Sequence, residues 1–275
     1  MASEWSHQGV EHAREARREL GSAGPPPDLL EAIERRARVH VVLLELPSQV
    51  AGAHVARPGL ALLLVNGRQA LARQRFTLAH ELGHNRMGHA TVVDEQAAIG
   101  GGYAHDPREV SANAFAAELL MPREWVRSWG AEKVRGAVTL EHVLLLANEL
   151  GVSAQAARYA LATAGVLRDR RRERQLDDEI AADLHRELGR WLGLAPRDDA
   201  LARAELPRIP PALRHSALGD LLAGALDVNG LARRLGTSRD AVDTMLRELR
   251  LDRLVPGAQP LRAPWSRDRA STSRR

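Results

Sequence analysis

The segment RFTLAHELGH, residues 75–84, holds two histidines and a glutamate at the spacing used by zinc hydrolases. His80 and His84 are four residues apart, so on an α-helix they lie on one face, about 40° apart around the axis. Both imidazoles can then bind one tetrahedral zinc ion. Glu81 lies beside them, where its carboxylate can take a proton from a water molecule that the metal activates. We therefore expect a zinc site at His80 and His84, with Glu81 as the catalytic base.

An exposed amphipathic helix with two surface histidines would show the same spacing. The residues around the motif argue against that interpretation, because Phe76, Ala79 and Leu82 are apolar or small. We therefore expect the histidine face of the helix to be packed against other parts of the protein.

A third protein ligand is needed to complete a catalytic zinc site. The metzincin pattern would place a glycine at position 87 and a histidine at position 90, but the chain has Met87 and Ala90 there. The remaining choice is a carboxylate from a second helix, as in His₂Glu sites. The segment EVSANAFAAELLMP predicts such a helix, which starts at Glu109 and ends before Pro122.

Glu109 is the expected third ligand because of the helix face on which it lies. It shares this face with Asn113, Ala116 and Leu120, so the face begins polar and continues apolar. Such a face suits a carboxylate that reaches a metal while the rest of the helix packs on the histidine helix. Glu118, the rival carboxylate, lies about 180° around the axis from Glu109, and we expect it to face solvent.

The two segments at residues 75–84 and 109–122 together resemble the ImmA/IrrE family of zinc metallopeptidases. A weaker resemblance extends over residues 1–165. The resemblance implies the same three ligands and the same base. It also implies a cytoplasmic endopeptidase that cleaves a DNA-binding repressor and so releases transcription.

The residue that stabilises the oxyanion on the peptide carbonyl stays open. Four side chains are candidates for this role: Tyr103, His89, His105 and His142. Neither the spacing nor the resemblance selects one of them.

The amino-acid composition indicates the cellular compartment in which this chemistry would take place. The 275 residues include no cysteine, which excludes disulfides and cysteine-ligated zinc and fits a reducing cytoplasm. The longest apolar run, residues 60–65, is too short to span a membrane, and residues 1–20 lack the apolar core of a signal peptide. The formal net charge is +4, but the positive residues are nearly all arginine, so we interpret the charge as a compositional bias. We expect a cytoplasmic protein that binds neither a membrane nor a nucleotide.

The order of the elements predicts an α+β fold. Helices at residues 11–20 and 27–38 precede strands at 39–46 and 60–67, and the histidine helix follows. This is the order of a minimal zincin-like core, a small antiparallel sheet packed on the HExxH helix and a second ligand helix. An edge strand of the sheet would hold a substrate peptide by main-chain hydrogen bonds. We expect the C-terminal half to be mainly helical.

The chain divides into four parts by composition. These are a metallopeptidase domain at 1–165 with a helical hairpin near 139–165, a helical linker at 166–204, a small helix-turn-helix-like domain at 205–255 and a disordered tail at 256–275. Because every proposed ligand lies before Pro122, removal of the chain after Arg168 should leave metal binding intact.

Two segments of the C-terminal half resemble each other and have a helix-turn-helix pattern. LANELGVSAQAARYAL begins at Leu146, and LARRLGTSRDAVDTML begins at Leu231. In each, an alanine is followed four residues later by a glycine and then by a serine placed to cap the next helix. A helical hairpin that serves only for packing has the same pattern and is the interpretation we favour. DNA contact through Arg239 and Arg247 of the second copy is the alternative.

Two functions from different classes follow from these patterns. In the first, the protein is a zinc-dependent endopeptidase that hydrolyses a peptide bond in a protein substrate, a helix-turn-helix repressor, and thereby derepresses genes. In the second, it is a regulator that keeps the zincin fold but binds DNA or a repressor through its helical C-terminal half. The presence of Glu81 favours the peptidase, because a binding protein needs no general base.

Overall fold

The computed structural model describes residues 2–37, 39–57, 60–90, 92–95, 106–194, 198–213, 216–235, 237–248, 251–252 and 255. The chain forms two compact units, Met1–Arg214 and His215–Arg275. The division therefore falls after the boundary that the sequence predicted at residue 205. The tail predicted at residues 256–275 lies outside the described residues.

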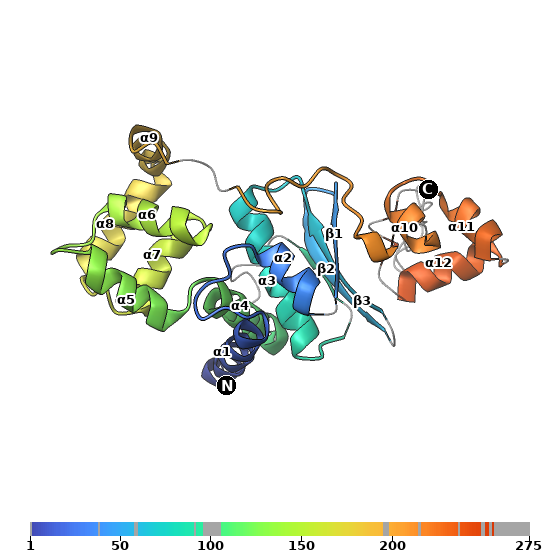
Figure 1. The fold of residues 1–275 in the computed structure, drawn as a ribbon, viewed down its shortest axis with the longest axis horizontal. Helices are drawn as coiled ribbons and strands as arrows, with labels where there is room; N and C mark the ends of the chain where they lie inside the picture. Colours follow the sequence, from blue (N-terminus) through green and yellow to red (C-terminus); the bar gives the residue numbers. More distant parts are fainter. Residues whose placement is uncertain are drawn as a thin grey trace, which may run out of the picture. The chain divides into compact units, whose positions relative to one another are not determined.

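The first unit is built on a four-stranded mixed sheet with the strand order β1-β3-β2-β4 (Figure 1). Its strands are β1 (His40–Leu44), β2 (Val50–Arg57), β3 (Leu60–Asn66) and β4 (Val92–Glu95). β2 pairs antiparallel with β3 and with β4, whereas β1 runs parallel to β3. The predicted α+β class is confirmed, but the sheet is not purely antiparallel as predicted. The reason is that β2 comes between β1 and β3 in the chain yet lies on the far side of β3.

Strand β2 was absent from the sequence-based prediction because its composition is poor for a strand. It reads VAGAHVAR, and alanine and glycine are depleted in strands. Position 52 must be a glycine because a Cβ atom there would lie 2.6 Å from Oε1 of Glu81 and 2.6 Å from Cγ2 of Thr77. Contact with the helix that packs on the sheet therefore overrides the local preference.

Two helices carry the metal-site motifs. α3 (Leu71–Arg86) contacts β2 and β3, and α4 (Pro107–Leu120) packs against α3 (Figure 1). Asp106 caps α4, since its carboxylate accepts a hydrogen bond from the backbone N–H of Arg108. The core includes buried residues from both helices: Leu78, Ala79 and Leu82 from α3, and Phe115, Ala116 and Leu119 from α4.

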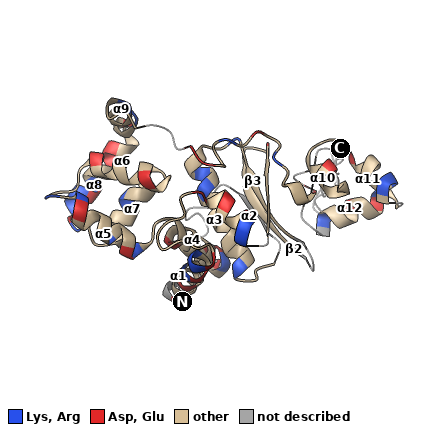
Figure 2. Ribbon diagram, in the orientation of Figure 1, with Lys and Arg blue, Asp and Glu red and all other residues tan. Residues whose placement is uncertain are grey.

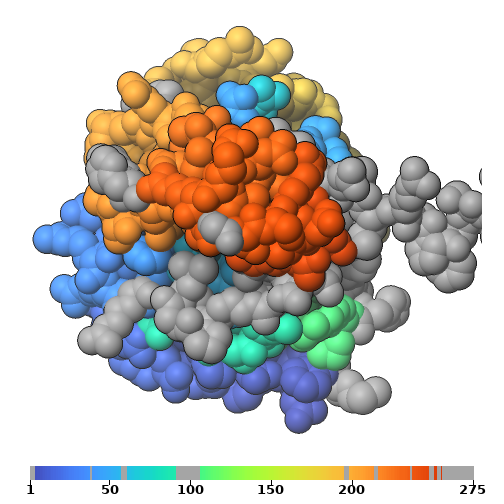
Figure 3. All heavy atoms as spheres, turned by 90° about the vertical axis from the view of Figure 1, so that its right-hand side faces the viewer, coloured from blue at the N-terminus to red at the C-terminus, as the bar shows by residue number. Residues whose placement is uncertain are grey.

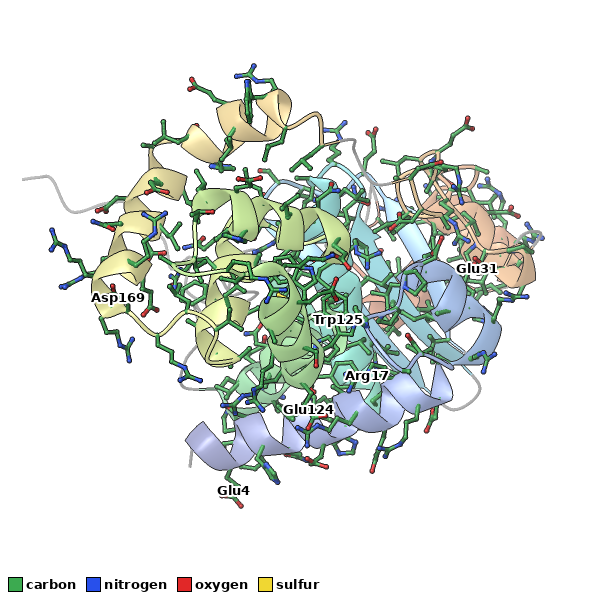
Figure 4. All side chains as sticks on the ribbon, turned by 60° about the vertical axis from the view of Figure 1, so that its left-hand side comes forward. Glu4, Arg17, Glu31, Glu124, Trp125 and Asp169 are labelled. Atoms are coloured by element: carbon green, nitrogen blue, oxygen red, sulfur yellow. The ribbon has the colours of Figure 1, made fainter. Side chains whose placement is uncertain are left out.

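Helix α1 (Ala2–Glu19) packs closely on α4. Gly9 permits this approach, because a Cβ atom there would lie 2.1 Å from the carbonyl oxygen of Ser111. The contact leaves Glu118 only 8% exposed, with its carboxylate 3.4 Å from Arg14 and 3.7 Å from Arg17. Figure 4 labels Arg17 on the side of α1 that faces the rest of the unit. The prediction that Glu118 faces solvent is therefore wrong, because α1 covers that side of α4.

The other helices of the first unit are mostly C-terminal to α4. They are α2 (Leu29–Arg36), α5 (Arg123–Lys133), α6 (Leu140–Leu150), α7 (Ala154–Thr163), α8 (Arg170–Ala181), α9 (Leu184–Trp191) and the short 3₁₀ helix η2 (Pro211–Leu213). α6 and α7 form a hairpin in which Gly151 has a φ of 66° and the hydroxyl of Ser153 accepts from the N–H of Ala156. This serine cap is the one that the helix-turn-helix pattern predicted.

Helix α8 packs against α7 and buries one of the polar side chains of α7. Arg158 of α7 is only 2% exposed and pairs with Glu173 at 2.9 Å and with Asp177 at 2.6 Å. Figure 2 shows that α8 carries charges of both signs. α8 thus covers Arg158 of this helix, which favours packing over DNA contact for that residue.

Residues 198–213, which we call the strap, return to the sheet after α9. Asp199 of the strap is buried and pairs with buried Arg75 of α3 at 2.7 Å. Arg75 also donates to the carbonyl oxygens of Pro26 and Leu150. The strap therefore neutralises a buried charge in the helix that carries the histidines.

A second part of the strap covers the edge of β1. Arg208 and Leu43 exchange two backbone hydrogen bonds of 2.9 and 3.1 Å, and the guanidinium of Arg208 pairs with Glu34 of α2 at 2.6 Å. Figure 1 shows this segment in orange above the sheet. Removal of the chain after Arg168 would remove both strap contacts, so the expectation that it leaves the metal site intact is revised.

The second unit contains three helices, α10 (Ala217–Leu222), α11 (Val228–Leu235) and α12 (Arg239–Glu248). Figure 3 shows the atoms of this unit as orange spheres. Their buried residues include Leu221, Leu231, Val242 and Leu246. Arg239, one of the candidate DNA contacts, donates to Asn229 at 3.2 Å and lies 3.5 Å from Asp243. These contacts within the unit favour packing for the second copy as well.

No helix in the described part of the chain combines the length and the apolar character that a membrane crossing requires.

Candidate metal centre

Three buried side chains from α3 and α4 bring their ligand atoms together. Nε2 of His80 and Nε2 of His84 are 3.0 Å apart. The carboxylate oxygens of Glu109 lie 3.3 Å from Nε2 of His80 and 3.4 Å from Nε2 of His84. His80 and His84 are adjacent because they are one helical turn apart, and Glu109 reaches them from the first turn of α4. Among the described residues, these three form the cluster suited to a metal ion.

The distances in this cluster fit a tetrahedral zinc ion. With zinc–ligand bonds of about 2.05 Å, neighbouring ligand atoms of a tetrahedron are about 3.3 Å apart. The corresponding distances here are 3.0, 3.3 and 3.4 Å. Two imidazoles and one carboxylate are also a donor set that zinc uses in catalytic sites, with the fourth position left for water or substrate. The residues present therefore fit the metal.

Asn113 sets the orientation of His80. Its Oδ1 lies 3.1 Å from Nδ1 of His80, and an amide oxygen can only accept a hydrogen bond. Nδ1 of His80 is therefore the protonated nitrogen, which leaves the lone pair on Nε2 directed at Glu109 and His84. A partner that holds the ring in this tautomer is the usual companion of a metal-binding histidine.

His89 has the same relationship to His84. The two Nδ1 atoms are 2.8 Å apart, so one donates and the other accepts. If Nε2 of His84 is to bind a metal, its Nδ1 must donate to a neutral His89. Burial lowers the pKa of His89 below its ordinary value, and the nearby charge of Arg108 lowers it further. Both effects favour the neutral acceptor that this arrangement needs.

Glu81 is completely buried between α3 and the sheet. Its Oε1 lies against β2 at the position where Gly52 has no side chain. The carboxylate therefore occupies a defined place beside the ligands without being one of them. That is the place expected for a base that accepts a proton from water next to the metal.

His54 of β2 is a buried residue near the site that the sequence-based prediction missed. Its ring is stacked on that of His84 with centroids 6.4 Å apart, and its Nε2 accepts a hydrogen bond of 3.4 Å from the side-chain amide of Asn85. His54 is two residues from Gly52, so both lie on the face of β2 that meets α3. A lone histidine in a segment not predicted to be a strand gave no signal of this contact.

The four oxyanion candidates have different outcomes. Tyr103 and His105 lie outside the described residues. His142 is at the start of α6, where its Nδ1 accepts from the backbone N–H of Thr139 at 3.1 Å as part of a capping box. His89 contacts His84 through Nδ1. The described structure thus gives two of the four candidates other contacts and leaves the oxyanion role unassigned.

Comparison with known proteins agrees with this geometry. Residues 34–162 match the family model described as Peptidase_M78, IrrE N-terminal-like domain. The matched residues include the three clustered side chains and Glu81. No curated protein matches the chain.

Proposed function

We propose, on the premise that residues 34–162 of this chain belong to the ImmA/IrrE family of peptidases, that the protein is a zinc-dependent endopeptidase. The observation that carries the proposal is the arrangement around Glu81. A buried carboxylate that is not a ligand adjoins a cluster of two imidazoles and one carboxylate whose ligand atoms are 3.0–3.4 Å apart. A protein that only bound a partner would need no such carboxylate.

His80, His84 and Glu109 would hold the metal. When bound, zinc lowers the pKa of a water molecule and polarises the peptide carbonyl as a Lewis acid. Asn113 and His89 keep the two imidazoles in the orientation and tautomer that this requires.

Glu81 performs the proton transfers. One of its carboxylate oxygens takes a proton from the attacking water, whose oxygen forms a bond to the carbonyl carbon of the substrate. The same carboxyl group then gives the proton to the leaving amide nitrogen as the carbon–nitrogen bond breaks. Burial against Gly52 holds the carboxylate at one place during both transfers.

The substrate chain would bind beside β4. An extended peptide can add to the edge of a sheet by main-chain hydrogen bonds. Within the described residues, the edge strands of this sheet are β1 and β4, and β1 already pairs with Arg208 of the strap. β4 is adjacent to β2, which contacts both Glu81 and His84 through Gly52 and His54. A peptide on β4 would therefore lie near the base and the ligands.

The resemblance to the family supports a finer proposal about substrate and place. We infer that the substrate is a DNA-binding repressor of the helix-turn-helix type and that its cleavage releases transcription in the cytoplasm. The absence of cysteine from the chain is consistent with a reducing compartment.

The test first determines whether the gene beside this one encodes a helix-turn-helix repressor. It then compares Glu81→Gln with wild-type protein in cells that co-express that repressor. Glu81→Gln keeps the size of the side chain but removes the base, so zinc content should stay at one per chain while repressor cleavage is lost. Glu31→Gln, at an exposed carboxylate of α2, is the control and should cleave normally. Undiminished cleavage or derepression by Glu81→Gln would overturn the peptidase assignment.

A further inference from the structure

Three adjoining cavities lie between α7 and its neighbours, away from the metal ligands. The first, of about 500 Å³, is lined by α1, α4 and α7, and the second, also of about 500 Å³, by α3, α4 and α7. The third, of about 470 Å³, lies between α7 and the start of α8. Tyr159 lines all three, and Met121 lines the first two. We call these three cavities, which share Tyr159 as a lining residue, the Tyr159 groove.

Tyr159 is an exposed aromatic side chain held in a fixed position. It is 53% exposed, and the guanidinium of Arg158 lies 3.6 Å from its ring centroid. Arg158 is itself fixed by Glu173 and Asp177 of α8. A rigid, half-exposed tyrosine in a concave surface is typical of the residues that contribute most to protein–protein binding.

The walls around Tyr159 are small and apolar. Ala117 of α4, Met121 directly after α4, and Ala156 and Ala160 of α7 line the first two cavities. Because the alanine side chains are small, the two cavities have volumes of about 500 Å³ each, within the range of pockets that bind apolar groups. The groove can therefore bury an apolar side chain of a partner against Tyr159.

The charges in the lining are mostly positive. Five arginines contribute to the three cavities, namely Arg14, Arg73, Arg123, Arg168 and Arg170, against two glutamates. Glu118 pairs with Arg14 of the lining and with Arg17 outside it, and Glu173 pairs with Arg170 of the lining and with Arg158 outside it. Three arginines of the lining are left in excess of the two glutamates. The lining therefore keeps an excess of positive charge that favours an acidic partner.

Arg73 of α3, which lines the second cavity, is partly buried. Desolvation lowers the pKa of its guanidinium below the ordinary value. Arg73 therefore adds a partly buried positive charge to the lining of the second cavity.

We propose that the Tyr159 groove binds a segment of a partner protein that carries acidic residues around an apolar side chain. The apolar side chain packs on Tyr159 and Met121, and the carboxylates pair with Arg73 and Arg123. Nucleic acid fits less well, because the walls around Tyr159 are formed by alanine and methionine side chains that suit an apolar side chain rather than a phosphate backbone. The chain's own residues 261–275 are rich in arginine and carry the wrong charge.

The test uses the full-length chain and a fluorescein-labelled peptide of twelve residues with equal numbers of Glu and Leu. Fluorescence anisotropy at low salt should show binding, and the same peptide with Lys in place of Glu should not bind. Tyr159→Ala and Arg123→Ala should each weaken binding about tenfold, as expected for the loss of one central contact. Trp191→Ala and Arg35→Ala, which remove an exposed aromatic and an exposed arginine elsewhere, are the matched controls.

Each alternative occupant has its own outcome. Equal binding of the Glu and Lys peptides, or no binding of the Glu peptide, would overturn the proposal. If duplex DNA displaced the peptide from the wild type, and DNA binding were lost in Tyr159→Ala, the groove would be a nucleic-acid site and the proposal would be wrong. A concentration-dependent dimer that Tyr159→Ala dissociates would make it a contact between two copies of the chain. Peptide binding by Glu81→Gln should equal that of the wild type, so the result does not depend on the proposed catalysis.

Discussion

Gly52 of β2 and Glu81 of α3 are in direct contact, since a Cβ atom at position 52 would lie 2.6 Å from Oε1 of the glutamate. The same Cβ atom would lie 2.7 Å from the carbonyl oxygen of Leu64 in the neighbouring strand. Backbone on one side and a helix on the other leave no room for even a methyl group. The position of the proposed base is thus set by the absence of a side chain on the strand.

The first prediction follows from this contact. Gly52→Ala should displace the carboxylate of Glu81 while leaving the three ligands in place, because none of them contacts position 52 among the atoms nearest to it. We expect zinc content to be retained and peptide cleavage to fall about 10²- to 10⁴-fold, the usual contribution of a general base. Metal analysis and a cleavage assay on the same sample measure both quantities.

The control for that variant is Gly189→Ala. Gly189 lies in α9, and a Cβ atom there has nothing within 4 Å, so the substitution should leave cleavage unchanged. If Gly52→Ala cleaved as well as Gly189→Ala, the contact with Glu81 would have no role in placing the base.

The second prediction distinguishes the two buried carboxylates of α4. Glu109→Gln should abolish stoichiometric zinc binding, because Glu109 is the carboxylate that lies 3.3–3.4 Å from the imidazoles. Glu118→Gln should keep zinc but lower the free energy of unfolding, because the buried carboxylate that pairs with both Arg14 and Arg17 is lost. Metal analysis and urea unfolding of both variants test this assignment. Zinc loss from Glu118→Gln with full occupancy in Glu109→Gln would reverse it.

The third prediction concerns the cap of the helix that carries Glu109. The hydrogen bond from Arg108 holds the pKa of Asp106 below its ordinary value of 3.8. A depressed carboxyl pKa contributes stability that is present above the unfolded value and is lost as the pH falls through the folded value. Asp106→Ala should therefore lower the free energy of unfolding by about 0.5–2 kcal/mol at pH 7.

The difference between wild type and Asp106→Ala should shrink as the pH falls below 3.8, where the carboxylate becomes protonated. Urea unfolding of metal-free protein at several pH values measures this difference without interference from zinc release. A difference that stayed constant down to the lowest pH would show that the charge of Asp106 does not stabilise α4.

The fourth prediction concerns the strap. Asp199→Leu leaves Arg75 buried without its carboxylate partner and should cost about 3–5 kcal/mol of stability. The double variant Arg75→Met with Asp199→Leu removes both charges and should recover much of that loss. A double variant less stable than Asp199→Leu alone would argue against a pairing role. Thermal unfolding of the single and double variants completes the cycle.

Truncations test the strap as a whole. A chain that ends at Arg214 keeps the first compact unit and should bind zinc with wild-type stoichiometry. A chain that ends at Arg168 loses Asp199, which pairs with Arg75, and Arg208, which pairs with Leu43, and should be strongly destabilised. Equal melting temperatures for the two truncated proteins would show that the metallopeptidase core does not need the strap.

The sequence by itself determined the local features of this site. His80 and His84 meet because the period of an α-helix places residues i and i+4 on one face, and this holds wherever the helix lies. The end of α4 before Pro122 was predicted correctly, because proline acts on its own neighbours. The helix begins at Pro107, two residues before the predicted start at Glu109, because Asp106 caps it. The choice of Glu109 over Glu118 also followed from helix geometry alone.

The tertiary structure decided whatever depends on residues far apart in the chain. Arg75 and Asp199 are 124 positions apart, and no local pattern relates them. Glu118 is buried because α1 packs on its side of α4, and the strand β2 forms although its alanines and glycine disfavour it. Burial and close packing outweigh local preference at these positions. The atoms that contact a position in the folded protein decide whether a side chain fits there, and those atoms come from distant parts of the chain.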